Sequence, residues 1–182
     1  PLGGVQGKPS PLIINAGKSF IGSFVLGMGF VLEPEEAQAL IEKDSRNLDI
    51  LFPYLNAEDI NSRPDQSPSR WTINFHDWPI EQAETYPDCL KIVQEKVKPE
   101  REKQNDKAGR ENWWLYVRTR PALYNAILNL NQVLVIPRHT KYMICTWEPT
   151  GIIYSDAACV IATESDADFA LLQSTFHGDW TR

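Results

Sequence analysis

The stretch that decides the fold class is residues 70–75, Arg70-Trp71-Thr72-Ile73-Asn74-Phe75. Polar and apolar side chains alternate along it, and most of the residues are aromatic or β-branched, which predicts a half-buried strand. Upstream, residues 47–68 are turn formers around one apolar knot, Leu51-Phe52-Pro53-Tyr54-Leu55. Downstream, apolar residues at helical spacing predict helix from residue 80 to about 108, which Pro99 should break or kink.

The segment before these turns is apolar and interrupted by glycine. In residues 16–32, Gly22, Gly27 and Gly29 disfavour helix and indicate bent strands with close backbone approaches. Pro34 then favours the first position of a helix, and the two glutamates that follow it suit the first helical turn.

The C-terminal half adds one helix, three strands and a closing helix. The first helix should begin at Pro121, the strand candidates are 133–136, 142–147 and 152–163, and Asp166 is the expected N-cap of the last helix. We expect a single mixed α+β domain, with a largely antiparallel curved sheet and flanking helices. A Gly- and Pro-rich flexible lead-in should occupy residues 1–14, and the domain residues 15–182.

Charge is unevenly distributed over the 182 residues. The net charge is −6, yet residues 91–120 hold nine Lys or Arg against five Asp or Glu. Such a segment suits either a phosphate-facing surface or a solvated helix with compensating charges. No apolar run approaches the roughly 18–20 residues of a membrane span, so we expect no membrane partner and a cytoplasmic location.

The patterns that usually carry catalysis or bind metal are incomplete in this sequence. Ala16-Gly17-Lys18-Ser19 resembles the end of a phosphate-binding loop, but Leu12 stands where that motif needs glycine. Pairing Cys145 with His139, or Ser19 with a histidine, has no supporting local motif. The three cysteines lack metal-ligand spacing and suit reduced, inert thiols. We therefore expect no catalytic residue, metal or cofactor in this chain.

Two groups of polar residues suit contacts with nucleic acid. Arg138, His139, Thr140 and Lys141 join two strand candidates and have the donors and acceptors that read base edges. A solvated hairpin turn fits their composition equally well. The side chains best suited to phosphate are Lys18, Arg63, Ser69 and Arg70. The six tryptophans suit core packing better than base stacking.

Several short blocks, taken in order, resemble the target recognition domain of MmeI-like (type IIL) restriction-modification enzymes and related phage-defence methylases. They are Asn15-Ala16-Gly17-Lys18-Ser19-Phe20-Ile21-Gly22-Ser23, Leu51-Phe52-Pro53-Tyr54-Leu55-Asn56, Ser69-Arg70-Trp71-Thr72-Ile73-Asn74-Phe75, Val97-Lys98-Pro99-Glu100-Arg101, Trp113-Trp114, Arg120-Pro121 and Phe169-Ala170-Leu171-Leu172-Gln173-Ser174. Together they extend from about residue 15 to Arg182. Family members continue beyond this point into an Arg- and Tyr-containing stretch that helps to read bases.

The resemblance implies sequence-specific recognition of double-stranded DNA. In this family the same polypeptide carries an adenine-N6 methyltransferase domain that uses S-adenosylmethionine, and many members add a nuclease. The methyltransferase tetrapeptide Asn-Pro-Pro-Tyr, or its Asp variant, does not occur in this sequence. The resemblance therefore implies a non-catalytic part of a methyltransferase, with DNA and the methyltransferase domain as partners. The alternative is a protein-interaction or scaffold domain that docks the methyltransferase to other subunits.

Overall fold

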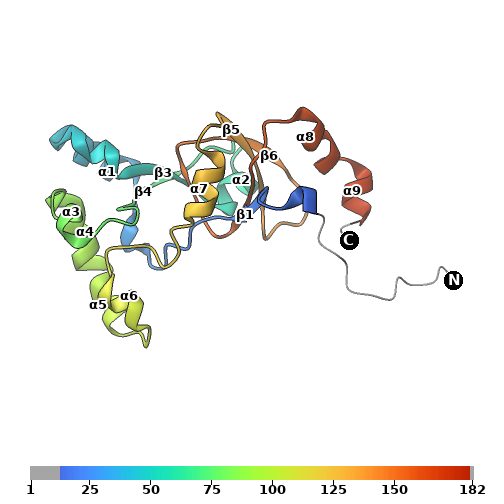
Figure 1. Ribbon diagram of the computed structural model, residues 1–182. Coiled ribbons are helices and arrows are strands. Elements are labelled where there is room, and N and C mark those ends of the chain that lie inside the picture. The colour runs from blue at the N-terminus through green and yellow to red at the C-terminus, as the bar shows by residue number, and fades with distance from the viewer. Residues whose placement is uncertain (1–12, 181–182) are drawn as a thin grey trace.

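The computed structural model describes residues 13–180, within which helices surround two four-stranded sheets (Figure 1). In chain order the elements are η1 (Ile13–Asn15), β1 (Ser19–Ile21), η2 (Met28–Phe30), β2 (Val31–Leu32), α1 (Pro34–Lys43), η3 (Ser45–Asp49), β3 (Leu51–Leu55), α2 (Ala57–Ser62), β4 (Arg70–Ile73), α3 (Ile80–Ala83), α4 (Pro87–Lys96), α5 (Lys98–Glu102), α6 (Lys107–Glu111), α7 (Pro121–Ile127), β5 (Gln132–Pro137), β6 (Thr146–Pro149), β7 (Ile153–Tyr154), β8 (Ala158–Ile161), α8 (Asp166–Leu172) and α9 (Thr175–Trp180).

The first sheet has the strand order β1-β8-β5-β6, and all its neighbours are antiparallel. Val160 of β8 pairs with Phe20 on one side and Val135 on the other. Its buried apolar residues join Leu123 and Ile127 of α7 and Ile60 of α2 in one core cluster. Burial of this shared apolar face fixes both helices against the sheet.

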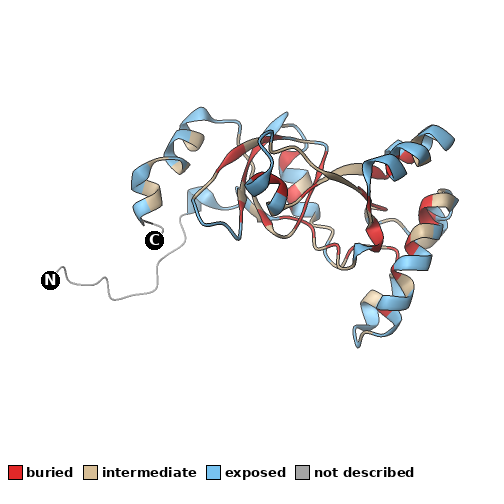
Figure 2. Cartoon of the chain, turned by 180° about the vertical axis from the view of Figure 1, so that it is seen from behind, coloured by how far each residue is buried: buried red, intermediate tan, exposed pale blue. Residues whose placement is uncertain are grey.

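The second sheet has the order β2-β4-β3-β7, in which only β3 and β7 are parallel. Thr72 lies at its centre, paired with Val31 and Phe52, and its hydroxyl lies 2.7 Å from the Tyr116 hydroxyl. A second core cluster packs this sheet against α1, α3 and α4. Figure 2 shows buried residues running from the central sheets out to these helices.

A short seam joins the two sheets. After β1, the Gly22 amide donates to Ala158 O (3.1 Å) and the Ser23 amide donates to Tyr154 O (2.7 Å). The Ser155 amide donates in turn to Leu55 O of β3 (2.9 Å). A Cβ on Gly22 would lie 2.2 Å from Ser155 O, so only glycine fits this close backbone approach.

The structure confirms most of the expected elements. The mixed α+β class with mostly antiparallel pairing is confirmed, as are the strand beginning at Arg70 and the helices beginning at Pro34 and Pro121. The helical stretch breaks before Pro99, but it also divides at Pro87, where α4 begins. Of the expected lead-in, residues 1–12 lie outside the described residues and Ile13 begins η1.

Other expectations need correction. Residues 51–55 form strand β3 rather than a knot between turns, although proline cannot donate to a β ladder. Pro53 is accommodated because β7 pairs with β3 only from Tyr54 onward. The strand expected at 142–147 begins at Thr146, because the residues before it lie in a loop that does not pair with β5.

Residues 152–163 are two strands that belong to different sheets, since the chain turns between Tyr154 and Ala158. The last helix is capped by Ser165 and not by Asp166. The Ser165 hydroxyl accepts a hydrogen bond from the Asp168 amide, which is the usual N-cap contact. The N-cap therefore lies one residue before the position expected from the sequence.

Glu148 of β6 is a buried acidic residue whose pKa is shifted by its surroundings. Glu148 is 4% exposed and pairs across the sheet with Val133. The pKa of Glu148 is raised from 4.5 to about 7, mainly by burial and also by the charges of Asp59 and Asp65, against a hydrogen bond from Thr146 that lowers it. The ionised form is therefore the less favourable one inside the fold.

We predict that Gly22→Ala destabilises the fold. The added methyl meets backbone atoms of the seam that cannot rotate away, which should cost about 3 kcal/mol or more. For a domain of this size the melting temperature should fall by roughly 6–12 °C. Gly178→Ala is the matched control, because a Cβ at that position meets no atom of the described residues within 4 Å. Equal melting temperatures for the two variants would contradict the close approach.

We also predict that Glu148 makes stability depend on pH. Between its unfolded pKa of 4.5 and its folded pKa of about 7, the folded protein keeps a proton that the unfolded chain has released. Stability is therefore fully present below 4.5 and falls as pH rises to about 7, by at most about 3 kcal/mol. Melting curves from pH 5 to 8 should show this loss, and the loss should disappear in Glu148→Gln. Parallel curves for the two proteins would refute the prediction.

Candidate functional site

The loop that follows β5 is fastened to the turn between β7 and β8. The Arg138 amide donates to Ala157 O (2.8 Å), and its guanidinium Nη1 donates to Asp156 O (2.7 Å). Arg138 is exposed, so these two bonds fix the direction of a side chain at the surface. The anchor is made with backbone carbonyls, which leaves the positive charge without a compensating carboxylate in this contact.

The rest of this loop presents polar side chains to solvent. His139, Thr140 and Lys141 are exposed, and the Asn61 side chain of α2 supports the loop by donating to His139 O (3.1 Å). The Thr140 hydroxyl donates to Tyr142 O (2.9 Å), and Lys141 Nζ lies 5.2 Å from the centre of the Tyr142 ring. The structure thus brings together all four residues expected to read base edges, on one supported loop.

The four residues expected to hold phosphate are not brought together. Arg63 ends α2 beside the loop, but its guanidinium contacts Asp65 (3.3 Å) and the Ser67 hydroxyl (3.1 Å). Lys18 is exposed next to the β1–β8 pair, where its carbonyl accepts the Ala162 amide. Lys18 therefore lies near the Ile161 end of β8. The loop 138–141 lies at the other end, where Ala158 pairs with Pro137.

Arg70 begins β4 of the second sheet, and Ser69 directly precedes it. Arg70 pairs with Tyr54 across β4 and β3 and lies 3.9 Å from Glu33, so a carboxylate competes for its charge. Both residues are half-buried. Their role as phosphate contacts stays a prediction, as does that of Lys18 and Arg63.

Two arginines that were not selected from the sequence lie on the same seam as the loop. The Arg118 and Phe24 backbones exchange two hydrogen bonds (3.1 and 3.2 Å), and Arg120 Nε donates to Gly22 O (3.1 Å). Gly22 in turn contacts Ala158, next to the carbonyls that anchor Arg138. We call Arg118, Arg120, Arg138 and Lys141 the basic rim.

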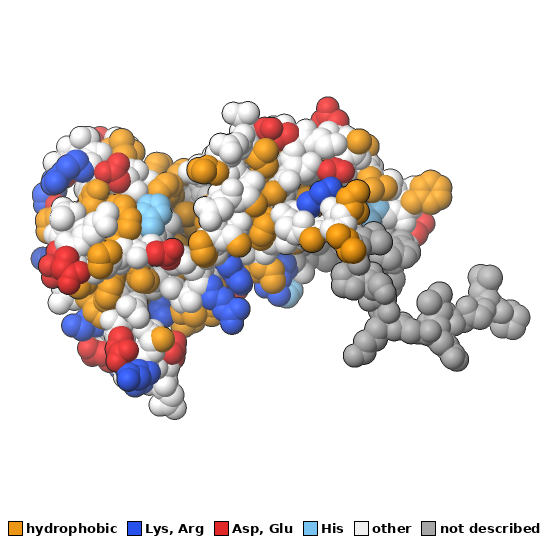
Figure 3. Space-filling model, in the orientation of Figure 1, with side chains coloured by type: hydrophobic (Ala, Val, Ile, Leu, Met, Phe, Trp, Pro, Cys, Tyr) orange, Lys and Arg blue, Asp and Glu red, His pale blue; other side chains and the backbone are white. Residues whose placement is uncertain are grey.

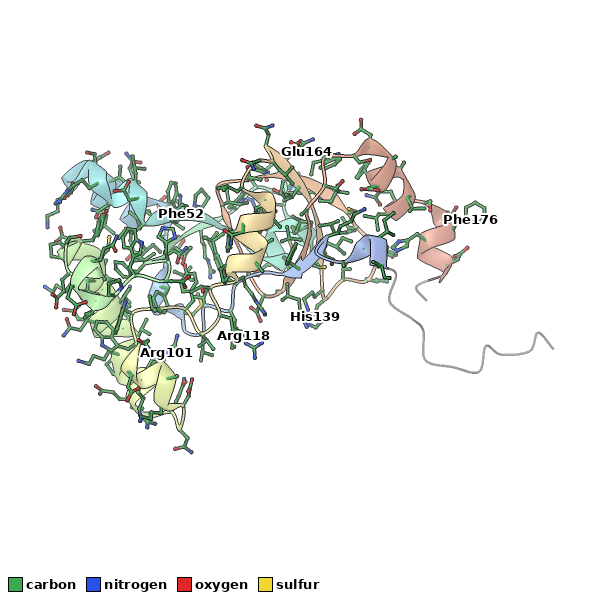
Figure 4. The ribbon with its side chains drawn as sticks, in the orientation of Figure 1. Phe52, Arg101, Arg118, His139, Glu164 and Phe176 are labelled. Carbon is green, nitrogen blue, oxygen red and sulfur yellow. The ribbon has the colours of Figure 1, made fainter. Side chains whose placement is uncertain are left out.

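The basic rim faces one side of the molecule. Arg118 and His139 both extend toward the lower edge in Figure 4, and Figure 3 shows Lys and Arg side chains gathered along that edge below the central sheets. The positive surplus of residues 91–120 was the sequence signal that pointed to Arg118 and Arg120. Their position could not be read from it, because it depends on contacts with residues nearly a hundred positions earlier.

Arg120 holds a strained backbone at this position. Its φ of 60° and ψ of 51° are left-handed, which costs a non-glycine residue about 1–3 kcal/mol. The residue is the N-cap of α7, directly before Pro121. The bond from its side chain to Gly22 O and the fixed start of α7 hold it there, so the direction of the guanidinium is set by the fold.

The groups considered for catalysis are not assembled. Burial raises the pKa of Cys89 to about 12 and that of Cys145 to about 11, the reverse of what an activated thiol needs. The Ser19 hydroxyl lies 3.2 Å from Cys159 Sγ. Within residues 13–180, no group of three or more His, Cys, Asp or Glu is placed to hold a metal ion.

The tryptophans pack largely inside the protein. Trp114 is buried and its indole N–H donates to Trp78 O (2.9 Å), while Trp147 stacks on Phe169. Trp113 is half-buried beneath Lys98, whose Nζ lies 5.3 Å from the ring centre.

Among the described helices, none has the length and apolar character needed to cross a bilayer. The basic rim is thus the feature that points to a polar, anionic partner.

Comparisons with known proteins identify the family and the fold. A family model for the target recognition domain of MmeI matches residues 8–182. A solved structure of the type IIL restriction-modification enzyme MmeI in complex with DNA is similar, with a TM-score of 0.70 and 19% identity over 91% of this chain. The similarity covers 22% of that MmeI chain, and at this identity it shows a shared fold. A comparison with curated protein sequences gave no match.

Proposed function

The chain belongs to the MmeI target recognition domain family, and from this membership we propose that it reads a double-stranded DNA target. The enzyme it serves would be an adenine-N6 DNA methyltransferase of a restriction-modification or phage-defence system. The observation that carries the proposal is the basic rim beside the polar loop 138–141. Arginine and lysine there supply phosphate attraction, and the loop supplies the groups that distinguish bases.

In this proposal the polar loop enters the major groove. A guanidinium reads guanine O6 and N7 through two parallel hydrogen bonds, which suits Arg138 because its direction is already fixed. His139, Thr140 and Lys141 extend from the same supported loop and contribute adaptable contacts. Arg118 and Arg120 lie along the seam from Arg138, where they meet the phosphate backbone and set the register.

Chemistry belongs to another part of the polypeptide. The similar MmeI chain is several times longer than this one, which leaves room for a methyltransferase domain that binds S-adenosylmethionine. The recognition domain would hold the duplex while the target adenine is flipped into that domain, at a cost of roughly a few kcal/mol. The residues of this chain then bind and position DNA without taking part in methyl transfer, in the cytoplasm where such systems act.

A scaffold role is the second candidate, and one observation favours it. Leu171 of α8 and Phe176 of α9 are 63% and 88% exposed, which gives these terminal helices an apolar surface suited to another protein domain. This surface and the basic rim involve different residues. The scaffold role therefore adds a partner without replacing DNA recognition.

We predict that Arg138→Ala relaxes the choice of base at one position. Selection of bound duplexes from a randomised library by the chain defines the preferred site. At one base pair of that site the variant should lose about 1–3 kcal/mol of discrimination, because a bidentate contact is removed. Equal losses on preferred and scrambled duplexes would remove Arg138 from base reading.

We predict a different signature for Arg118→Ala. Loss of a phosphate contact should weaken binding to all duplexes alike and reduce the slope of log K against log salt by about one. Lys18→Ala tests the position expected from the sequence in the same assay. Arg46→Ala is the control, because it removes one exposed arginine that lies in η3, outside the basic rim, and is paired with Asp44. An Arg118 variant that binds like the Arg46 variant would contradict the assignment.

A further inference from the structure

A groove of about 620 Å³ adjoins the basic rim. It lies between β1, the α5–α6 pair and the segment from Leu115 to Leu123. Its walls include Arg118 and Arg120 of the rim and, from α5, the side chain of Arg101. We call this space the Arg101 groove.

Arg101 is an unusual residue to find in such a wall. It is 1% exposed. The side-chain hydrogen bonds that it makes within residues 13–180 all come from Nη2, which donates to Val25 O (3.2 Å), Leu26 O (3.5 Å) and Leu115 O (3.3 Å). Its Nε is buried and has no acceptor among the described residues. A buried guanidinium whose side-chain hydrogen bonds go only to carbonyls has no direct ionic partner among the described residues, which is costly unless an anion binds it.

The charges around the groove leave it positive. Asp77 and Asp106 also line it, but each already accepts a hydrogen bond, Asp77 from the Thr119 hydroxyl (2.8 Å) and Asp106 from the Ala108 amide (3.2 Å). Burial lowers the pKa of Arg101, while the charges of Asp106 and Glu100 act to raise it. Neither acid comes within ion-pair distance of Arg101 in the described residues. With three arginines against two aspartates, the lining attracts an anion.

Glycine keeps the groove open beside the guanidinium. A Cβ on Gly109 of α6 would lie 3.2 Å from Arg101 Nη1 and 2.8 Å from Asp106 Oδ2. Both of these atoms are the ends of flexible side chains, so the fold itself does not require glycine at this position. An added methyl would nevertheless occupy the space through which a ligand reaches Nη1.

We propose that the Arg101 groove receives a backbone phosphate of the bound DNA, so that α5 and α6 hold the duplex at a second point beside the basic rim. This inference rests on the proposed function. A DNA phosphate fits because the rim arginines continue the groove toward the loop, and in Figure 4 Arg118 lies between Arg101 of α5 and His139 of the loop. Phosphate oxygens accept charge-assisted hydrogen bonds from the N–H groups of a guanidinium and neutralise its charge.

The test combines a spectroscopic signal with a variant that narrows the groove. The Nε–H resonance of Arg101 is identified in a ¹⁵N spectrum of the chain by its loss in Arg101→Lys. We expect this resonance to shift when the selected duplex is added. Gly109→Ala should weaken duplex binding by about tenfold, the loss of one charge-assisted contact, and lower the salt slope by about one. Gly178→Ala is the matched control and should bind like the unaltered chain.

The outcomes separate this inference from the function on which it rests. If the duplex binds but the Arg101 resonance stays in place and Gly109→Ala binds normally, the groove proposal is overturned and DNA recognition stands. If no duplex binds, both are overturned. A shift with inorganic phosphate but not with duplex would identify a free-phosphate site and overturn the proposal. A shift of the Arg101 resonance that appears without DNA, when the chain is part of the longer polypeptide, would also overturn the proposal. It would identify a carboxylate from another domain as the partner of Arg101.

Discussion

The close backbone approach between Gly22 and the turn at Ser155 is the constraint on which the rest of the structure depends. Three amide hydrogen bonds run along this seam, and the one from the Ser23 amide to Tyr154 O links the first sheet to the second. A side chain at residue 22 would force the two backbones apart. The two core clusters are then held on either side of a few backbone hydrogen bonds rather than by one continuous apolar layer.

The same seam positions the basic rim. Arg118 pairs with Phe24, Arg120 donates to Gly22, and Arg138 is anchored on the carbonyls of residues 156 and 157. Arg118 and Arg120 come from the segment before α7 and Arg138 from the loop after β5, and each is fastened through backbone groups. The hydrogen bonds that Arg120 and Arg138 donate from their side chains fix the directions of these two guanidinium groups, which lowers the entropy lost when they bind a partner.

Local chemistry determined what could be predicted from the sequence. Proline at 34 and 121 fixed two helix starts, alternation fixed β4, and the glycine pattern foretold a close approach at residue 22. The assignment of β7 and β8 to different sheets depends on contacts between distant segments, which no local pattern encodes. The polar loop could be selected from the sequence because residues 138–141 are contiguous. The positions of Arg118 and Arg120 could not, because they depend on hydrogen bonds to Phe24 and Gly22.

Anchoring and exposure divide this surface into a constant part and a replaceable part. The side chains of His139 and Lys141 are exposed and support no core contact, so their identities can change at little cost to stability. Arg101, Arg120 and Gly22 are bound into the backbone and cannot change in this way. The whole chain carries a net charge of −6, so its attraction to DNA depends on where its cations gather. The basic rim places three arginines and a lysine beside the replaceable loop, so under the proposed function a duplex drawn to these cations meets the residues proposed to read its sequence.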